Sequence, residues 1–462
     1  MIASVKNQVI EFVDNRSIVI LGFGREGRST YHFLRNILPD YPLLIADANL
    51  GIKQDSELLS DFNLSFELGA SYLKEIRQYE LVFKSPGISF KDYKIPPNQE
   101  ISSQTDLFLR LFSAQCIGVT GTKGKSTTVS LLNHILNQLM PHVLLVGNIG
   151  MPALDVVNQI NSSTIIIYEL SSHQLEYVHH GPHIGILLNL FQEHLDHYNS
   201  YEDYRNAKWN MARFQSKNDV FICCGEELQV TKDIQNQNIE SSVLQYGFGV
   251  NNDLYMLDDG ILVFNQAGKF HLKPQDFPLL GKHNLNNLLS VLLVCQQLHL
   301  PIEKVLTTLK TFKPLAHRLE FVAEVQGVRF YNDSIATIPQ ATIKAVESID
   351  KVATLILGGF DRGIDYQILI DFLLHHDSLQ LLLVGDVGKR INAQLLSNNY
   401  SGMMKLVSFD SLVLEALKIT PKGMACLFSP AASSYDSFKN FEERGLHFVK
   451  LVSDSKNVSI EQ

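Results

Sequence analysis

Two glycine-rich loops, each lying between an apolar strand and a helix, constrain the fold of this 462-residue chain more than any other feature. One loop occupies residues 22–27, after the apolar run 17–21 and before a helix predicted at about 29–38. The other occupies residues 118–127, after the apolar run 116–120. Strand, glycine turn and helix in this order form the repeating unit of parallel α/β sheets. The sequence therefore predicts an α/β fold.

Strand-like and helix-like segments alternate almost throughout the chain, and they separate into three blocks. At roughly 100–200 residues per domain, the length is compatible with this number. A polar, Pro-containing stretch at 91–99 precedes the first boundary, and Phe312-Lys313-Pro314 marks the second. We expect a Rossmann-like domain in residues 1–112, a central domain with a mostly parallel sheet in 113–311, and a second Rossmann-like domain in 312–462.

Composition excludes several classes of function. The chain has 39 Lys and Arg against 48 Asp and Glu, a net charge of −9, and no basic run, so we expect no nucleic-acid partner. Its longest apolar stretches fall far short of the ~20 residues of a membrane-spanning helix, and the N-terminus has no signal-peptide core. Five cysteines without metal spacing are typical of reduced thiols. We expect a cytoplasmic monomer without membrane insertion.

The second glycine-rich loop reads Gly-Val-Thr-Gly-Thr-Lys-Gly-Lys-Ser-Thr. Glycines let successive N–H groups turn toward an anion, Lys125 can reach outer phosphates, and Ser126 can hold Mg²⁺. The spacing departs from the standard phosphate loop, because Val119 stands where a glycine is expected. We interpret the segment as a nucleoside triphosphate site, with a purely structural turn as the alternative. The residues expected to contact ATP here are Gly121, Thr122, Lys123, Gly124, Lys125, Ser126 and Thr127.

The first glycine-rich loop, Gly-Phe-Gly-Arg-Glu-Gly, matches a dinucleotide-binding fingerprint. Asp47 lies 20 residues after Gly27, where an acid that binds ribose would stand. Taken literally, the pattern indicates an NAD enzyme. Such a loop can equally hold the diphosphate of a nucleotide sugar, and a second nucleotide site downstream makes hydride transfer less natural. We favour a uridine-diphosphate-type ligand, and NAD or a merely structural turn remain as alternatives.

Polar residues follow the apolar strands of the central block. Glu169 closes one strand, His194 and Asp196 come shortly after the next, and Lys208 lies on a helix predicted at 201–214. The carboxyl ends of parallel strands converge on the crevice where α/β proteins bind substrates. Mg²⁺ prefers oxygen ligands such as Glu169 and Ser126, so His194 would be an unusual addition. The pattern predicts a magnesium site.

Taken together, these motifs resemble those of the Mur ligase family, and within it the branch that adds glutamate to UDP-N-acetylmuramoyl-L-alanine. The resemblance covers the chain nearly from end to end. Its specificity comes from many motifs that stand in family order. They are residues 118–127, Gly147-Asn-Ile-Gly150, Glu169-Leu-Ser-Ser172, Glu193-His-Leu-Asp196, Tyr204-Arg-Asn-Ala-Lys208, residues 281–287, His317-Arg-Leu-Glu320, Asn332-Asp-Ser334 and residues 429–445.

The resemblance implies an ATP-dependent ligase of peptidoglycan precursor synthesis. ATP would phosphorylate the alanyl carboxylate, the glutamate amine would attack the acyl phosphate, and phosphate would leave. Lys125 would stabilise the transferring phosphoryl group, and Ser126 and Glu169 would bind one Mg²⁺. His194 and a carbamoylated Lys208 would hold a second ion, because an unmodified Lys⁺ would repel it. The expected cofactors are therefore ATP, two Mg²⁺ ions and a lysine carbamate at Lys208.

The resemblance also assigns the remaining binding residues in three groups. Four of them would contact ATP, nine the uridine nucleotide substrate, and four the incoming glutamate. The ATP group is Asn284, Asn287, Arg318 and Asp333; the nucleotide-sugar group is Gly24, Arg25, Glu26, Gly27, Asp47, Ser85, Pro86, Gly87 and Asn148; the glutamate group is Thr337, Arg362, Ser434 and Phe441.

The amino-acid site departs from the common family pattern. Ile335 stands where a lysine is usual, and Arg362 stands near an expected glutamate-binding lysine. Some relatives with such features add L-glutamate, which we keep as the alternative. We expect D-glutamate as the substrate because it is the usual one in this branch of the family. A non-catalytic nucleotide-binding regulator is a further alternative, although intact metal-site and phosphate-site residues argue against it, namely Lys125, Glu169, His194 and Lys208.

Overall fold

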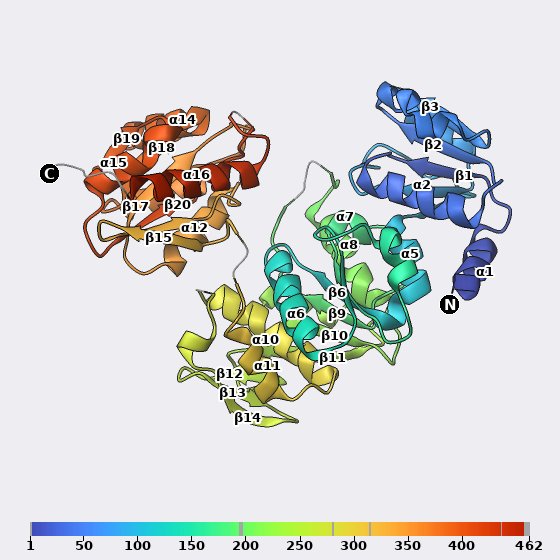
Figure 1. The fold of residues 1–462 in the computed structure, drawn as a ribbon, viewed down its shortest axis with the longest axis horizontal. Helices are drawn as coiled ribbons and strands as arrows, with labels where there is room; N and C mark the ends of the chain where they lie inside the picture. The colour runs from blue at the N-terminus through green and yellow to red at the C-terminus, as the bar shows by residue number, and fades with distance from the viewer. Residues whose placement is uncertain (1, 194–196, 280, 314–315, 436, 457–462) are drawn as a thin grey trace. The chain divides into compact units, whose positions relative to one another are not determined.

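The computed structural model describes residues 2–193, 197–279, 281–313, 316–435 and 437–456 and contains three β-sheets with helices packed around them (Figure 1). The chain forms two compact units. Unit 1 comprises Met1–Phe277 and Leu285–Phe312, and unit 2 comprises Pro278–Asn284 and Lys313–Gln462. The predicted α/β fold with parallel-rich sheets is confirmed.

The first sheet of unit 1 has five strands in the order β3-β2-β1-β4-β5, all parallel. The chain builds this sheet outward from β1 in one direction and then returns to the other side of β1. Ligands of such sheets bind at the carboxyl ends of the two strands where the direction changes, here β1 and β4. The elements are α1 Ile2–Val13, β1 Ile18–Leu21, α2 Arg25–Ile37, β2 Leu43–Asp47, α3 Ser56–Leu59, β3 Leu64–Leu68, α4 Tyr72–Glu75, β4 Leu81–Lys84 and β5 Glu100–Ser102.

The second sheet of unit 1 has nine strands in the order β14-β13-β12-β11-β10-β9-β6-β8-β7. The strands from β7 to β12 are parallel, and β13 and β14 add an antiparallel edge. The strands are β6 Cys116–Thr120, β7 Val143–Gly147, β8 Ile165–Glu169, β9 Ile184–Leu187, β10 Val220–Cys224, β11 Ser242–Gly247, β12 Leu254–Met256, β13 Ile261–Phe264 and β14 Gly268–His271. The helices of this part are α5 Gln104–Phe112, α6 Lys125–Leu139, α7 Ser172–Leu175, α8 Tyr201–Arg213, α9 Leu228–Ile234, α10 Lys282–Gln297 and α11 Ile302–Leu309.

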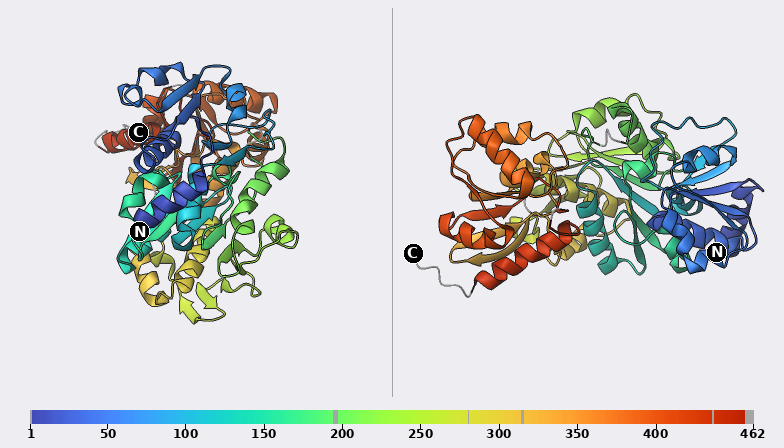
Figure 2. Two further views of the ribbon diagram at one scale, coloured as in Figure 1. Left: turned by 90° about the vertical axis from the view of Figure 1, so that its right-hand side faces the viewer. Right: turned by 90° about the horizontal axis from the view of Figure 1, so that it is seen from above.

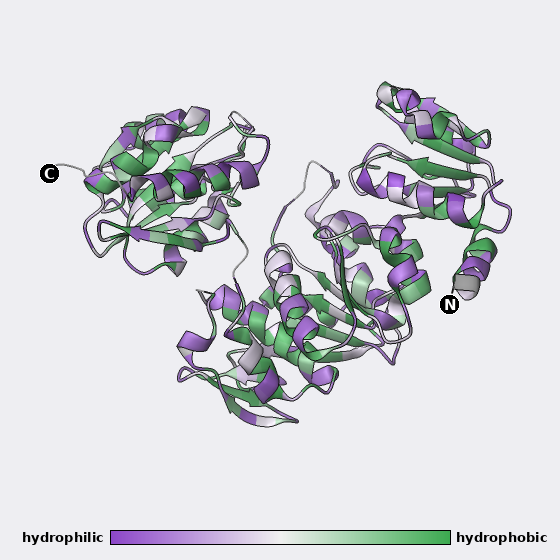
Figure 3. Cartoon of the chain, viewed as in Figure 1, coloured by the Kyte–Doolittle hydropathy of each residue, from purple (hydrophilic) through white to green (hydrophobic). Residues whose placement is uncertain are grey.

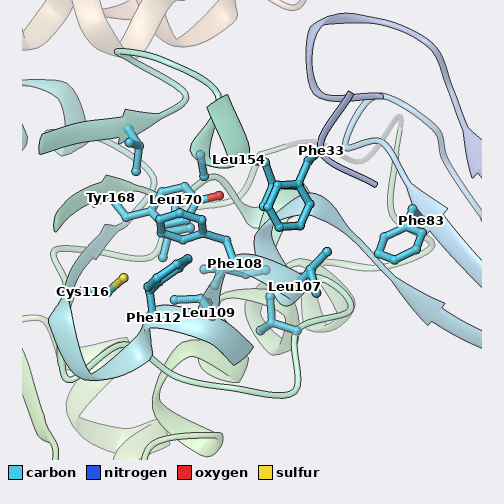
Figure 4. Packing of buried hydrophobic residues seen from close by; sticks show 14 of the residues in the cluster. Phe33, Phe83, Leu107, Phe108, Leu109, Phe112, Cys116, Leu154, Tyr168 and Leu170 are labelled. Carbon is cyan, nitrogen blue, oxygen red and sulfur yellow. The ribbon is translucent and has the colours of Figure 1, made fainter. Parts of the chain in front are cut away.

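One hydrophobic cluster runs through both sheets of unit 1 (Figure 4). It begins with Phe33 and Phe83 around the first sheet and continues through Phe108 on α5. It then reaches Cys116 and Tyr168 on strands of the second sheet. Because burial of apolar area is the main favourable term in folding, this continuous cluster makes the two sheets a single packed unit.

Unit 2 contains a six-stranded sheet in the order β15-β16-β20-β17-β18-β19, in which only the pair β15 and β16 is antiparallel. Helices cover both of its faces (Figure 2). Leu355 and Leu357 belong to the cluster with α12–α14, whereas Ile356 belongs to the cluster with α15 and α16. The elements are β15 Glu320–Val325, β16 Val328–Asn332, α12 Pro339–Ser348, β17 Val352–Gly358, α13 Gln367–Leu374, β18 Gln380–Val384, α14 Gly385–Ser397, β19 Met404–Leu406, α15 Leu412–Ile419, β20 Ala425–Phe428 and α16 Phe441–Ser455.

Apolar residues concentrate on the strands, while the polar residues of the helices face outward (Figure 3). Every residue of β1 and β6 is buried, as expected for parallel strands that are covered on both faces. Among the helices that the structure describes, none has both the length and the apolar character needed to span a bilayer. All five cysteines are buried and free.

Candidate active site

The loop between β6 and α6 has the backbone shape that its glycines predict. Gly124 precedes α6 with φ +89°, a left-handed conformation that favours glycine. A Cβ at this position would lie only 2.6 Å from Asn287 Oδ1, so a larger residue here would displace the Asn287 side chain of α10. Lys125 opens α6, and its Nζ donates to the carbonyls of Gly121 at 2.9 Å and Thr122 at 3.0 Å. The 15-residue α6 directs its N-terminal dipole at this loop, a favourable site for phosphate.

The segment after β9 holds the same loop from the other side. The backbone N–H of Thr122 donates to Asn189 O at 3.0 Å, and that of Lys123 donates to Asn189 Oδ1 at 2.8 Å. The Thr122 hydroxyl lies 2.7 Å from the Tyr204 hydroxyl on α8. Lys123 forms an ion pair with Glu193 at 2.5 Å. Sequence reasoning missed the contact between Thr122 and Tyr204, because neither hydroxyl carries a pattern that reveals its partner.

Glu169 ends β8 beside the loop, in register with Val119 of β6. Its side chain is fully buried, and Oε1 accepts from Asn148 Nδ2 at 3.0 Å and from Ser126 Oγ at 3.3 Å. The other oxygen, Oε2, is buried and has no hydrogen-bond partner among the described residues. A buried carboxylate is costly unless something pairs with its charge. An uncompensated carboxylate oxygen next to a hydroxyl suits a hard cation such as Mg²⁺.

The metal prediction therefore fits Ser126 and Glu169. Within the described residues, no three His, Cys, Asp or Glu side chains gather closely enough to hold a metal ion by themselves. This arrangement agrees with the habit of Mg²⁺, which keeps several waters and takes one or two carboxylates together with substrate phosphates. His194 and Asp196 lie outside the described residues.

Lys208 reaches the loop from α8 and is 2% exposed. Its Nζ donates to Gly121 O at 2.9 Å and to Thr120 Oγ1 at 3.3 Å, and lies 5.1 Å from the centre of the Tyr204 ring. Burial, together with the charge of Lys125, holds the pKa of the Lys208 amine well below its usual range. The structure thus brings the predicted Lys208 to the phosphate loop with its amine biased toward the neutral form.

The first glycine-rich loop is closed by contacts with its own surroundings. The backbone N–H of Phe23 donates to Asp47 Oδ2 at 2.6 Å, and Ser85 Oγ donates to Gly22 O at 2.6 Å. A Cβ on Gly27 would lie 2.0 Å from Gly22 O, so this turn requires glycine. The predicted Asp47 and Ser85 therefore meet the loop, and Pro86 and Gly87 continue the turn after β4.

Two further predicted residues of this group extend toward the second sheet. The Arg25 guanidinium donates to Gly150 O. Glu26 Oε1 accepts from Gln174 Nε2 at 2.7 Å, whereas its Oε2 is buried without a hydrogen-bond partner in the described part of the chain. Burial raises the pKa of the Glu26 carboxyl. Asn148, predicted to contact the nucleotide sugar, lies at Glu169.

The predicted ATP residues outside the loop are largely buried. Asn284 and Asn287 both lie on α10, and both are buried. In unit 2, Asp333 accepts from Ser429 Oγ at 2.7 Å and from the backbone N–H of Leu319 at 3.3 Å. Burial raises the pKa of Asp333 to about 7, against the influence of the nearby Arg318 charge.

The predicted glutamate residues also lie in unit 2, and a buried arginine organises their surroundings. Arg444, 2% exposed, donates to Ser334 O at 2.8 Å and to Ser433 O at 2.9 Å, next to the predicted Ser434. Ser334 Oγ in turn donates to Phe441 O at 2.8 Å. Sequence reasoning missed this role, although the motif that contains Phe441 also contains Arg444. Thr337 is half-buried and Arg362 is exposed.

The second glycine-rich loop follows β6 of a largely parallel sheet and precedes the N-terminus of α6. Two lysines, Lys125 and Lys208, and the buried carboxylate of Glu169 lie beside this loop. These features define a nucleotide-phosphate-binding α/β protein. A family model described as the Mur ligase middle domain matches residues 119–295. A UDP-N-acetylmuramoylalanine--D-glutamate ligase of Caldanaerobacter subterraneus subsp. tengcongensis is 31% identical over 95% of this chain and 98% of its own. The enzyme of the same name from Alkaliphilus metalliredigens is 30% identical over 95% and 98%.

Solved structures share the fold. The MurF ligase of Thermotoga maritima in complex with ADP superposes with a TM-score of 0.60 at 16% identity, covering 95% of this chain and 96% of that one. A MurF structure from Acinetobacter baumannii gives a TM-score of 0.60 at 14% identity, covering 95% and 90%. The chain belongs to the Mur ligase family, whose members are ligases that use ATP and Mg²⁺ to form peptide bonds in peptidoglycan precursor synthesis. The resemblance drawn from the motifs is confirmed.

Proposed function

We propose that this chain adds D-glutamate to UDP-N-acetylmuramoyl-L-alanine and hydrolyses ATP to ADP and phosphate in doing so. The observation that carries the proposal is the buried Glu169 beside Ser126 and Lys125 at the phosphate loop, with one oxygen that has no hydrogen-bond partner in the described part of the chain. Relatives that carry the name of this activity align with the chain over nearly its full length. The two alternatives, an NAD enzyme and a non-catalytic nucleotide-binding regulator, have no such support.

The reaction would proceed in two steps whose demands match the residues at hand. An oxygen of the alanyl carboxylate attacks the γ-phosphorus of ATP, and ADP leaves. The glutamate amine then attacks the acyl carbon, the bond to the phosphate oxygen breaks, and the amine loses a proton. Little covalent chemistry falls to the protein, so positioning and charge stabilisation dominate. Lys125 would stabilise charge on the transferring phosphoryl group.

Metal binding would fall to Ser126 and Glu169 for one Mg²⁺, and to His194 and Lys208 for a second. Bound Mg²⁺ would neutralise charge on the phosphate oxygens. For Lys208 we propose a carbamate formed with CO₂, a reaction that needs the neutral amine. The buried position of Lys208 and its lowered pKa support this modification.

Substrate selection would be divided among three domains, for which we propose the bounds 1–112, 113–311 and 312–462. The nucleotide sugar would bind the first glycine-rich loop with Asp47 and the turn Ser85-Pro86-Gly87. Asn284, Asn287, Arg318 and Asp333 would complete the ATP site. Thr337, Arg362, Ser434 and Phe441 would receive glutamate.

We propose D-glutamate from the names of the relatives, and L-glutamate is the alternative because Ile335 removes a usual cation. We further propose a cytoplasmic monomer.

The decisive assay measures phosphate release from ATP with UDP-N-acetylmuramoyl-L-alanine and Mg²⁺, with D- and L-glutamate in separate reactions. We expect release with D-glutamate and formation of the dipeptide product. Phosphate release with L-glutamate but not with D-glutamate would overturn the proposed enantiomer of the substrate, while the proposed ligase activity would stand. Absence of release with both would overturn the proposed function.

A further inference from the structure

A partly buried ion pair joins the last residue of β4 in the first sheet of unit 1 to the end of α7, which follows β8 of the second sheet. Lys84 is the last residue of β4, and its side chain is 1% exposed. Its Nζ donates to Glu176 Oε2 at 3.0 Å and lies above the rings of Phe90 and Tyr177, 5.5 and 5.4 Å from their centres. Glu176 follows α7 directly. Lys84 also immediately precedes Ser85, the first residue of the turn proposed to hold the nucleotide sugar.

A second contact ties the same carboxylate to the same segment. His197 Nε2 lies 3.2 Å from Glu176 Oε2. The backbone carbonyl of His197 accepts from Ser89 Oγ at 2.8 Å. Residues 84–89 therefore contact segments that follow strands of the second sheet at two places: the Lys84 side chain contacts Glu176, and the Ser89 hydroxyl contacts His197. Glu176 and His197 also contact each other, so the two places are connected.

The backbone of Glu176 connects in turn to the helix that carries Lys208. Asn210 Nδ2 donates to Leu175 O at 3.1 Å and to Glu176 O at 3.2 Å. These carbonyls end the short helix α7, so Asn210 caps it from α8. Asn210 stands two positions after Lys208. A continuous set of polar contacts thus runs from the Ser85 turn through Lys84, Glu176 and Asn210 to α8.

Stability alone does not explain why Lys84 and Glu176 are charged residues. Removing two charges from water costs free energy that their attraction hardly recovers, and apolar residues of similar volume often stabilise as well. Burial lowers the pKa of the Lys84 amine despite its partner. The pKa of Glu176 is lowered even against burial, because His197 and Lys84 both interact with the carboxylate. What a charged pair adds over an apolar one is a defined geometry.

We propose that Glu176 is a positioning residue, which couples binding of the nucleotide sugar at the Ser85 turn to the placement of Lys208 at the phosphate loop. The inference rests on the proposed function, because it takes the ligand of the turn and the role of Lys208 from there. Glu176 itself touches neither reacting group. Its loss should impair both the affinity for the nucleotide sugar and turnover, while the affinity for ATP stays the same.

The test compares single and double variants of the full-length protein in the phosphate-release assay. Glu176→Gln leaves Lys84 buried without its counter-charge, so this variant alone could lose activity through misfolding. Lys84→Met combined with Glu176→Gln removes both charges, and its Tm should return to within a few degrees of the wild-type value. Asp155→Asn is the matched control, since Asp155 also joins the two sheets, through a 2.6 Å contact with Ser29 on α2.

We expect the double variant to show a KM for the nucleotide sugar raised about tenfold and a kcat lowered about tenfold, with the KM for ATP within about twofold. Asp155→Asn should keep wild-type kinetics. If the double variant regained both wild-type Tm and wild-type kinetics, Glu176 would be merely structural and the inference would be overturned. Wild-type protein silent with both glutamates would instead overturn the proposed function, and this inference with it.

A second pair of variants tests the contact between Asn210 and the end of α7, which involves no buried charge. Asn210→Ala removes the contact with α7, and Asn206→Ala is its control, because Asn206 lies on the same helix and accepts only from Arg213 in the contacts described. We expect Asn210→Ala to raise the KM for the nucleotide sugar about fivefold, at the lower end of the coupling range. Equal kinetics in the two asparagine variants would count against the coupling even if the double variant failed to fold.

Discussion

The two glycine-rich loops of unit 1 share a local structure and differ in what surrounds them. Each follows a fully buried strand, contains a glycine with positive φ and leads into a long helix. In the first loop, the neighbouring strands supply Asp47 and Ser85, and both of these form hydrogen bonds with the loop backbone. In the second, β8 and α8 supply Glu169 and Lys208, whose ionisable groups are buried beside it.

The difference teaches that the adjacent elements, and not the glycine turn, decide what such a loop does. The first loop has one buried carboxylate oxygen without a hydrogen-bond partner among the described residues, Glu26 Oε2, and its turn is held by Asp47 and Ser85. The second brings together a carboxylate oxygen without a hydrogen-bond partner among the described residues, an amine with a lowered pKa and a helix N-terminus. Perturbed ionisable groups of this kind are concentrated at reaction sites.

The largest effect should come from Lys125, whose Nζ donates to two backbone carbonyls of the second loop. We expect Lys125→Ala to lower kcat by about 10³-fold, because it removes an electrostatic stabiliser of the phosphoryl group. The KM for the nucleotide sugar should change little, since that ligand belongs to the first loop. Lys123→Ala is the comparison, with a loss of about tenfold, because Lys123 is half exposed and paired with Glu193. Equal losses in steady-state assays would break the contrast.

The buried carboxylate of the second loop should affect activity and stability in opposite directions. Glu169→Gln should lower kcat by about 10²-fold and raise the Mg²⁺ concentration needed for half-maximal rate. Its Tm should equal or exceed the wild-type value, because a buried negative charge disappears. Glu226→Gln is the control: this carboxylate accepts from the backbone N–H groups of Phe248 and Gly249, so its loss should lower the Tm and spare kcat. A large loss of Tm in Glu169→Gln would contradict the account.

In the first loop the important property is shape. Gly27→Ala should destabilise unit 1 by about 1–3 kcal/mol, because the added Cβ would clash with Gly22 O. Gly24→Ala, where a Cβ meets nothing within 4 Å, should change stability by less than about 0.5 kcal/mol. Calorimetric unfolding measures both. Equal stability of the two variants would show that the turn is looser than described.

The smallest effect concerns the pH dependence of Glu26. Because burial raises its pKa in the folded state, the unfolded chain loses this proton first as pH rises above about 4.5. Stability is therefore lost between that pH and the folded-state pKa. Glu26→Gln should remove this loss, so its Tm advantage over wild type should grow from pH 4 to pH 8. An advantage that is constant with pH would show that Glu26 does not titrate differently in the two states.

Much of the fold could be predicted because parallel strands have buried, continuous apolar sequences. The strand predicted at 116–120 is β6, residue for residue. The helix predicted at about 29–38 begins earlier, at Arg25, because Gly24 serves as its N-cap and the glycine-rich segment already contains its first turn. The sequence pattern does not predict the antiparallel edge strands β13 and β14 as individual strands, since short half-exposed strands lack a strong hydrophobic period.

The candidate site divides in the same way. Lys125, Ser126 and Glu169 could be predicted from the sequence, because strand ends and helix starts converge in parallel sheets. Lys208 came only from the family resemblance, since a lysine on a helix is usually exposed. The link from Lys84 through Glu176 to Asn210 could not be predicted, because it joins segments about 90 and 34 residues apart by tertiary packing alone.

The central claim is that the second loop activates the substrate carboxylate while the first loop only holds the nucleotide sugar. The most direct test uses UDP-N-acetylmuramoyl-L-alanine labelled with ¹⁸O in its free carboxylate, followed by mass analysis of the released phosphate. An acyl phosphate requires one ¹⁸O atom in phosphate for each peptide bond formed. Unlabelled phosphate released together with dipeptide product would contradict the account.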